Sequence, residues 1–293
     1  MYAITNTDLT RGQKIEEKVF KGLMIVATYF ILVVLTIIIY SIFEKGIRSI
    51  SWEMLTQIPH GGYYYGKGGG ILNAILGSLA LASGATVLAF LIGMPVALYL
   101  NVFLIRHKKV VDIIRFLLDL VWGIPSIVYG AFGFSLMIFF GLQTSLLAGI
   151  LTVTLFILPI MIRSMDEILC TVPIGLQEAA YSLGSNKSEI AFKIFTRQSF
   201  SGIVTAVLLS FGRGIGDAAA VLFTAGYTDH LPNGLLEPVA TLPLSIFFQL
   251  SSPVPEVQNR AYASALVLTL IILIVSLFSR GLGKRYHKTK INF

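Results

Sequence analysis

Long apolar segments alternate with shorter polar ones along most of this chain. Six of the apolar segments are long enough to cross a bilayer as a helix, which takes roughly 20 residues, and they cover 23–43, 71–100, 116–140, 144–162, 200–224 and 261–278. The pattern predicts an all-α polytopic membrane protein with six transmembrane helices. A polar loop at 44–70 separates the first span from a predicted core at 71–280. The first span is longer than the apolar region of a signal peptide, so we expect it to be retained as an anchor.

The stretch 173–199 interrupts this pattern with charged residues, so we expect it to lie outside the membrane. Its first half predicts a short helix, because apolar residues recur at the spacing of one helical face: Leu176, Ala179, Ala180 and Leu183. Pro173 is placed to begin this helix, and Gly184 to end it at a C′ position. Asn186 then offers an N-cap, with Glu189 at the capping-box position of a second short helix. We expect the pair to bind a partner protein, because lipid does not cover its apolar face.

Composition supports the membrane assignment. The chain is 55% hydrophobic and only 13% charged, whereas soluble domains carry about 25% charged residues. The single cysteine, Cys170, excludes an internal disulfide. The four histidines are isolated from other metal-ligating residues. The sequence therefore predicts no metal site and no cofactor.

The net charge of +7 raises the question of a nucleic-acid partner. In the six-span arrangement, however, seventeen of the 22 Lys and Arg residues fall on one side of the membrane and four on the other. Basic residues concentrate in cytoplasmic loops of membrane proteins. The asymmetry therefore predicts that the helix pair and both termini, 1–22 and 281–293, lie in the cytoplasm, and it removes the reason to expect nucleic acid.

The remaining basic residue, Arg213, falls inside the fifth span. It lies 13 residues beyond the start of that span, or about 20 Å along a helix, where an Arg costs roughly 2.5–3.5 kcal/mol to insert. Asp217 follows at i+4 and is expected to share an ion pair with it. Such a pair either holds two helices together or faces a solute path, and the second is the usual role of intramembrane charge. Gly212 and Gly216 either expose backbone to that path or serve close helix packing.

The run Gly123-Ile124-Pro125-Ser126 lies inside the third span. A proline within a span commonly produces only a kink. A broken helix would instead present backbone groups to a cavity, and on that interpretation Pro125 and Ser126 belong to the solute path.

The helix pair resembles a known motif. Glu178-Ala179-Ala180, followed by Gly184 and Ile194, is similar to the EAA loop of binding-protein-dependent ABC importer permeases. The resemblance implies the MetI-like fold of that family. It also implies that Glu178, Ala179, Ala180 and Gly184 couple the permease to a cytoplasmic ATPase, by docking a helix-turn-helix into a groove. The family continues Ile-x-Leu-Pro where this chain has Ile194-Phe195-Thr196-Arg197, so we expect the second helix to run on into the fifth span.

Further motifs resemble PstA-type permease subunits of phosphate importers over about residues 68–280. They are Gly69-Gly70-Ile71, the run 123–130, Gly212-Arg213 with Gly216-Asp217, the run 222–226 and the run 240–243. In that family a Glu stands where this chain has Asp217. The resemblance implies a prokaryotic plasma membrane location and three partners: a sister permease (PstC type), an ATP-binding subunit dimer (PstB type) and a phosphate-binding protein (PstS type).

The sequence therefore predicts half of the pore of an ATP-driven inorganic phosphate importer. It contains no P-loop, so ATP hydrolysis is assigned to a partner and the chain is not predicted to be an enzyme. The planar fork of Arg213 suits an oxyanion. One alternative is an ABC permease for sulfate, molybdate or tungstate. Another is a secondary anion transporter, which needs no docking helices and commonly shows two related halves; this chain shows no such repeat.

Overall fold

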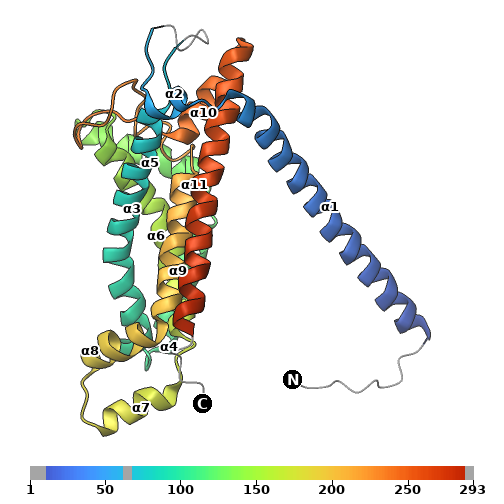
Figure 1. The fold of residues 1–293 in the computed structure, drawn as a ribbon. Helices are drawn as coiled ribbons and strands as arrows, with labels where there is room; N and C mark the ends of the chain where they lie inside the picture. The colour runs from blue at the N-terminus through green and yellow to red at the C-terminus, as the bar shows by residue number, and fades with distance from the viewer. Residues whose placement is uncertain (1–10, 62–67, 288–293) are drawn as a thin grey trace.

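The computed structural model describes residues 11–61 and 68–287, and within these ranges all regular structure is helical (Figure 1). In chain order the helices are α1 (Arg11–Ser49), α2 (Trp52–Thr56), α3 (Leu72–Leu98), α4 (Lys108–Trp122), α5 (Ser126–Phe139), α6 (Leu146–Leu169), α7 (Ile174–Ser182), α8 (Lys187–Glu189), α9 (Thr196–Ile215), α10 (Leu242–Leu250) and α11 (Pro255–His287). A π-helical turn at Tyr99–Phe103 extends α3. Another, at Ile190–Phe195, joins α8 to α9 without a break, as the sequence predicts.

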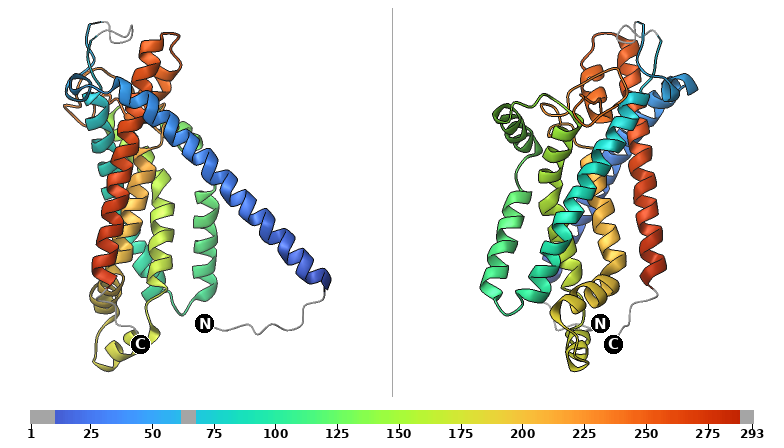
Figure 2. Two further views of the ribbon diagram at one scale, coloured as in Figure 1. Left: turned by 45° about the vertical axis from the view of Figure 1, so that its right-hand side comes forward. Right: turned by 90° about the vertical axis from the view of Figure 1, so that its left-hand side faces the viewer.

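Among the described residues, five helices are long and apolar enough to cross a membrane. They are Gly12–Ser49, Leu72–Phe103, Leu146–Leu169, Lys187–Ile215 and Pro255–Gly281, and each contains most of one predicted span. The remaining predicted span, 116–140, is divided between α4 and α5. These two helices together carry the chain from the end of the bundle near α7 to the opposite end, where α6 begins (Figure 2).

The break between α4 and α5 follows from local chemistry. Pro125 has no backbone N–H to donate and disfavours helical geometry at the preceding residue. It adopts an extended conformation, with ψ of 140°, as the N-cap of α5. Gly123 ends α4 by donating to the carbonyls of Asp119 and Leu120. The sequence-based interpretation of 123–126 as a broken helix is therefore confirmed in its geometry.

Helix α6 lies at the centre of the bundle, between α3 and α9. Five of its large side chains are fully buried, namely Val153, Ile157, Met161, Met165 and Leu169. On α3 the facing positions include Ala85 and Ala89, whose small side chains allow the helices to approach closely. The three helices form a rigid scaffold for the side chains described below.

Helix α1 contacts the bundle near its own C-terminal end, at Ser49. It crosses α11 there and diverges from it towards Arg11 (Figures 1 and 2). Gly46 permits the crossing, because a Cβ at that position would lie 2.8 Å from the carbonyl oxygen of Tyr262. Residues 12–40 are exposed in this single chain. Their apolar side chains are therefore available to lipid or to another subunit.

The predicted helix pair is present at the end of the bundle where α11 ends and α1 begins (Figure 1). Gly184 has a φ of +80°, and it donates to the carbonyl of Tyr181 at 3.0 Å. Ser185 donates to the carbonyl of Ala180 at 3.0 Å, which completes a Schellman motif. Asn186 and Glu189 form the predicted capping box, with hydrogen bonds of 2.8 and 3.1 Å. The predictions for Gly184, Asn186 and Glu189 are confirmed.

The helix that carries the predicted apolar stripe is present, but the expectation that its whole apolar face is uncovered is wrong. Ala180 is buried in the core and Leu176 packs partly against it. Ala179 is exposed, and Leu183 is 86% exposed. This same chain covers one edge of the face, because α7 packs against the π-helical turn Ile190–Phe195. The other edge is open to a partner.

Candidate translocation site and coupling surface

Arg213 lies in the last turn of α9, which ends at Ile215. The predicted helix to residue 224 is therefore wrong, and turns follow from 218 to 225. Gly212, Gly214 and Gly216 weaken the helix. The Asp217 carboxylate then stabilises a turn, because its Oδ2 accepts a hydrogen bond from the Ala220 N–H at 2.7 Å. A positive charge in the last turn of a helix is favourable, since the unsatisfied carbonyls there carry partial negative charge.

The expected ion pair between Arg213 and Asp217 is also wrong. Among the described residues no ion pair joins these two side chains. The i,i+4 spacing brings side chains together only while the helix continues, and here it ends between them. Arg213 instead places its guanidinium carbon 5.4 Å from the centre of the Phe156 ring, at the distance of a cation–π contact.

Arg213 and Asp217 nevertheless face the same hollow, which has a volume of about 500 Å³. Helices α6, α9 and α11 contribute to its wall, together with Asp217: Phe156, Leu208, Leu209, Gly212, Arg213, Gly216, Asp217, Ile272 and Ser276. Its wall is mostly apolar, so the charge of Arg213 is the main attraction that it offers to an anion.

The glycines on this wall keep the hollow open. A Cβ on Gly212 would meet no atom within 4 Å, and one on Gly216 would make only ordinary contact with Ile272, at 3.7 Å. Gly214 points instead towards α6, where a Cβ would lie 3.2 Å from Val153. Close packing within this chain therefore accounts for Gly214 but not for Gly212.

Pro125 and Ser126 do not line this hollow. The break that they form is connected to it through two aromatic rings. Tyr129 of α5 donates its hydroxyl to the Val121 carbonyl at 2.8 Å. The Tyr129 ring packs edge-on against the ring of Phe156, with centroids 5.7 Å apart. The Phe156 ring in turn makes the cation–π contact with Arg213. The break and the hollow thus belong to one connected region.

The residues of the coupling motif are divided between surface and core. Glu178, Ala179 and Gly184 are exposed, whereas Ala180 is buried. Nothing within 4 Å would meet a Cβ at Gly184, so this turn stands free of the rest of the chain. Glu178 and Ala179 therefore form an open surface, and Ala180 anchors that surface to the bundle.

The sequence analysis missed Asp166, whose side chain is 0% exposed. It lies near the end of α6, three residues after Arg163, and this spacing of opposite charges at the edge of an apolar segment is the signal that could have found it. Cys170 lies next to it, where burial, and after it the Asp166 charge, raises the pKa of the thiol. Within the described residues, no three His, Cys, Asp or Glu side chains lie together as metal ligands would.

Known proteins show extended similarity to this chain. The phosphate transport system permease protein PstA of Haemophilus influenzae is 33% identical over 271 residues, which cover 92% of this chain and 94% of that protein. The protein of the same name from Yersinia pestis is 34% identical over 254 residues, covering 85% of this chain and 84% of that protein. A solved structure of the MetNI methionine ABC transporter in an inward-facing conformation matches with a TM-score of 0.61. It is 19% identical and covers 74% of this chain and 95% of that chain, so it supports the fold alone.

The family described as binding-protein-dependent transport system inner membrane component matches residues 85–288. That range contains α4 to α9, the hollow with Arg213 and the coupling motif on α7. Family and fold agree with the helix pair confirmed at Gly184 and Asn186. The chain belongs to the family of binding-protein-dependent transport system inner membrane components, and its fold is MetI-like.

Proposed function

We propose that this chain is a transmembrane permease subunit of an ATP-driven inorganic phosphate importer and forms half of its translocation pathway. The identity of 33–34% to two phosphate permeases over most of the chain favours phosphate over sulfate, molybdate or tungstate. A secondary anion transporter would have no use for the coupling surface on α7.

The observation that carries this proposal is the position of Arg213. Arginine side chains carry a positive charge in proteins, and among the described residues Arg213 has no carboxylate partner. It lines a hollow among apolar side chains, where electrostatic attraction is stronger than in water. The ring of Phe156 holds it more weakly than an ion pair would, so an anion can engage it and then leave again, as conduction requires.

Asp217 gives the same hollow a means of selection. Phosphate near neutral pH still carries a proton and can donate a hydrogen bond, whereas fully ionised sulfate can only accept. One oxygen of Asp217 is engaged by the Ala220 N–H. Its carboxylate would accept a hydrogen bond from phosphate and would repel sulfate. Selectivity would then come both from attraction of phosphate and from rejection of sulfate.

The energy source lies outside this chain. We place the ATP-binding subunits against Glu178, Ala179 and the Gly184 turn, and a sister permease against the open side of the hollow. A phosphate-binding protein would deliver substrate at the opposite end of the bundle. This arrangement places α7, the start of α1 and the end of α11 in the cytoplasm of a prokaryotic cell, with the chain in its plasma membrane.

The proposal is tested with the complete importer in vesicles, by measuring phosphate uptake against sulfate, molybdate and tungstate. Arg213→Ala is expected to abolish uptake of every oxyanion while the binding protein still binds phosphate. Arg48→Ala is the matched control, because the ion pair that Arg48 makes among the described residues is with Glu44 on its own helix. Uptake by Arg213→Ala at the unaltered rate would refute the role of the hollow, and uptake of another oxyanion in preference to phosphate would refute the substrate.

A further inference from the structure

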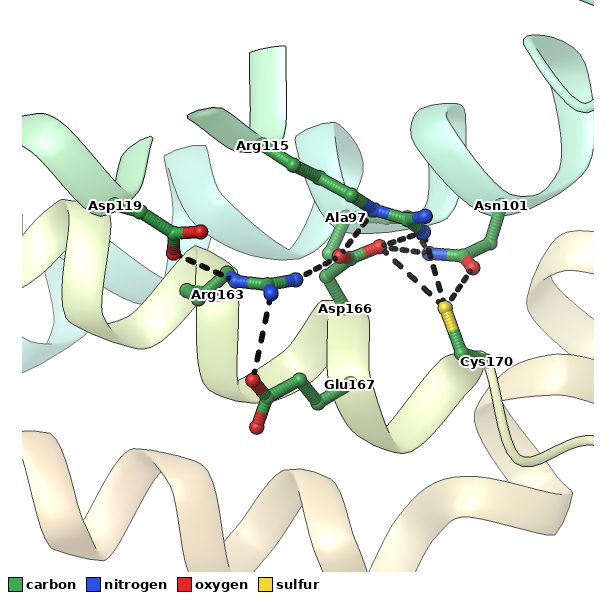
Figure 3. Close-up of polar contacts among 8 residues, drawn as sticks. All are labelled: Ala97, Asn101, Arg115, Asp119, Arg163, Asp166, Glu167 and Cys170. Atoms are coloured by element: carbon green, nitrogen blue, oxygen red, sulfur yellow. Dashed lines mark hydrogen bonds and ion pairs between the residues drawn. The ribbon is translucent and has the colours of Figure 1, made fainter. Parts of the chain in front are cut away.

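A buried charge cluster lies at the end of the bundle nearest α7 (Figure 3). Asp166 of α6 is at its centre. Its Oδ1 accepts from Arg115 Nη2 at 2.9 Å and from Asn101 Nδ2 at 2.8 Å. Its Oδ2 accepts from Arg115 Nε at 2.8 Å and from Arg163 Nη1 at 3.0 Å. We use the name buried charge cluster for these four residues: Asn101, Arg115, Arg163 and Asp166.

The cluster determines where α4 lies. Only Val111 among the residues of α4 is buried, so apolar packing alone fixes this helix weakly. Two ion pairs join it to α6 instead: Arg115 with Asp166 through a two-bond fork, and Arg163 with Asp119 at 2.8 Å. Fork contacts fix orientation as well as distance. Because the Asp166 side chain is excluded from solvent, water does not compete for its bonds.

The cluster is also next to the coupling helix in the chain. Asp166 lies in the last turn of α6, and only Cys170, Thr171 and Val172 separate that helix from Pro173, the N-cap of α7. A cavity of about 300 Å³ lies between the cluster and α7, lined by Asn101, Arg115 and Cys170 on one side and by Ile174 and Gln177 of α7 on the other. This short link to α6 is one route by which force on α7 enters the bundle; the contacts of α7 with Ile190–Phe195 are another.

The far end of α4 leads to the hollow. Val121, in its last turn, accepts the hydroxyl of Tyr129, whose ring contacts Phe156 beneath Arg213. A shift of α4 relative to α6 thus changes the surroundings of Arg213. Asp166 holds the middle of α4 through Arg115. The Pro125 break separates the end of α4 from the start of α5, and the Tyr129 hydroxyl joins the two helices across it.

We propose that Asp166 is a positioning residue for transport. Through Arg115 it makes α4 move together with the end of α6, so that displacement of α7 by the ATPase reaches the helix break beside Arg213. This inference rests on the proposed function. A cluster that served only to hold the fold together would change how much importer assembles, but not how much phosphate each assembled importer moves per ATP.

The test measures phosphate uptake and ATP hydrolysis by the complete importer in vesicles. Asp166→Asn keeps the shape of the side chain and removes its charge. It is expected to lower phosphate uptake per ATP by about tenfold, an ordinary size for coupling between two sites. Glu167→Gln is the matched control: the adjacent carboxylate is 63% exposed and lies 3.6 Å from Arg163. It should leave the ratio of uptake to hydrolysis unchanged.

Arg115→Lys supplies a second variant, which keeps the charge and loses the fork. It is expected to lower the same ratio, and the double variant with Asp166→Asn should lose little more than the worse single variant, since both changes break one contact. If either assembled variant takes up as much phosphate per ATP as the unaltered importer does, the inference is overturned. Failure of both variants to assemble would also overturn it, because the cluster would then be needed for folding. Absence of phosphate-stimulated ATP hydrolysis in the unaltered importer would instead refute the proposed function.

Discussion

Gly184→Val tests the turn between α7 and α8, where the backbone alone decides the outcome. Gly184 has a φ of +80°, and an added Cβ would meet no atom within 4 Å. A steric clash of the new Cβ with the rest of the chain therefore adds nothing to the free-energy cost of the substitution. The cost comes from the left-handed backbone, which is about 1–2 kcal/mol for a residue with a Cβ and larger for a β-branched one.

A cost of about 2 kcal/mol shifts a local equilibrium by up to about 30-fold. It opposes a turn held by two hydrogen bonds, from Gly184 to Tyr181 and from Ser185 to Ala180, each 3.0 Å long. We expect Gly184→Val to reorient α7 relative to α8 and to reduce phosphate-stimulated ATP hydrolysis and uptake by about 10-fold or more. Helices α3, α6 and α9 should remain packed, because a Cβ added at Gly184 would meet no atom within 4 Å.

The assay is uptake and ATP hydrolysis by the assembled importer in vesicles, normalised to the amount of complex. Gly184→Asn is the decisive control, because Asn tolerates the left-handed conformation. It should retain most activity. Gly175→Ala adds a methyl to α7 in equally open space and at ordinary φ, so it should be neutral. Normal coupling in Gly184→Val, or equal damage from Asn and Val, would refute this reasoning.

Three further predictions concern the pore, the topology and the single cysteine. Asp217→Asn should retain part of the phosphate flux and admit more sulfate, measured in an importer variant that needs no binding protein; loss of all flux, as expected for Arg213→Ala, would assign Asp217 to structure instead. With Cys170 replaced, a cysteine at Leu236 should react with an impermeant thiol reagent from outside and one at Ser188 only from inside, and equal reaction at both would contradict the topology. Native Cys170 is exposed, yet it should alkylate slowly at pH 7 and faster above its raised pKa, because the thiolate is the reactive form; fast reaction at pH 7 would contradict the raised pKa of its thiol.

The sequence by itself determined the features that depend on neighbouring residues. The turn at Gly184 and the capping box of Asn186 with Glu189 involve bonds between residues no more than five apart. Pro125 favours a break because it lacks an N–H, and Gly123 two residues before it ends α4. Pro95 and Pro159 lack an N–H as well but lie inside helices that continue. Five of the six predicted membrane spans follow from the length and apolarity of single segments, although the fifth ends at Ile215 instead of residue 224. The segment 116–140 is divided between α4 and α5. These predictions hold because each depends on local chemistry that tertiary packing does not reverse.

Only the tertiary structure decided which charges meet. The spacing of Arg213 and Asp217 suggested an ion pair, but α9 ends between them and Arg213 lies over Phe156, 57 positions earlier in the chain. Asp166 is hydrogen-bonded to Arg115, 51 positions away in the chain, and to Asn101, 65 positions away. Only the packing of the bundle brings the helical segments of these two residues beside it. A buried charge takes whichever partner the fold places within hydrogen-bonding distance, because an unpaired one is too costly to keep in an apolar interior.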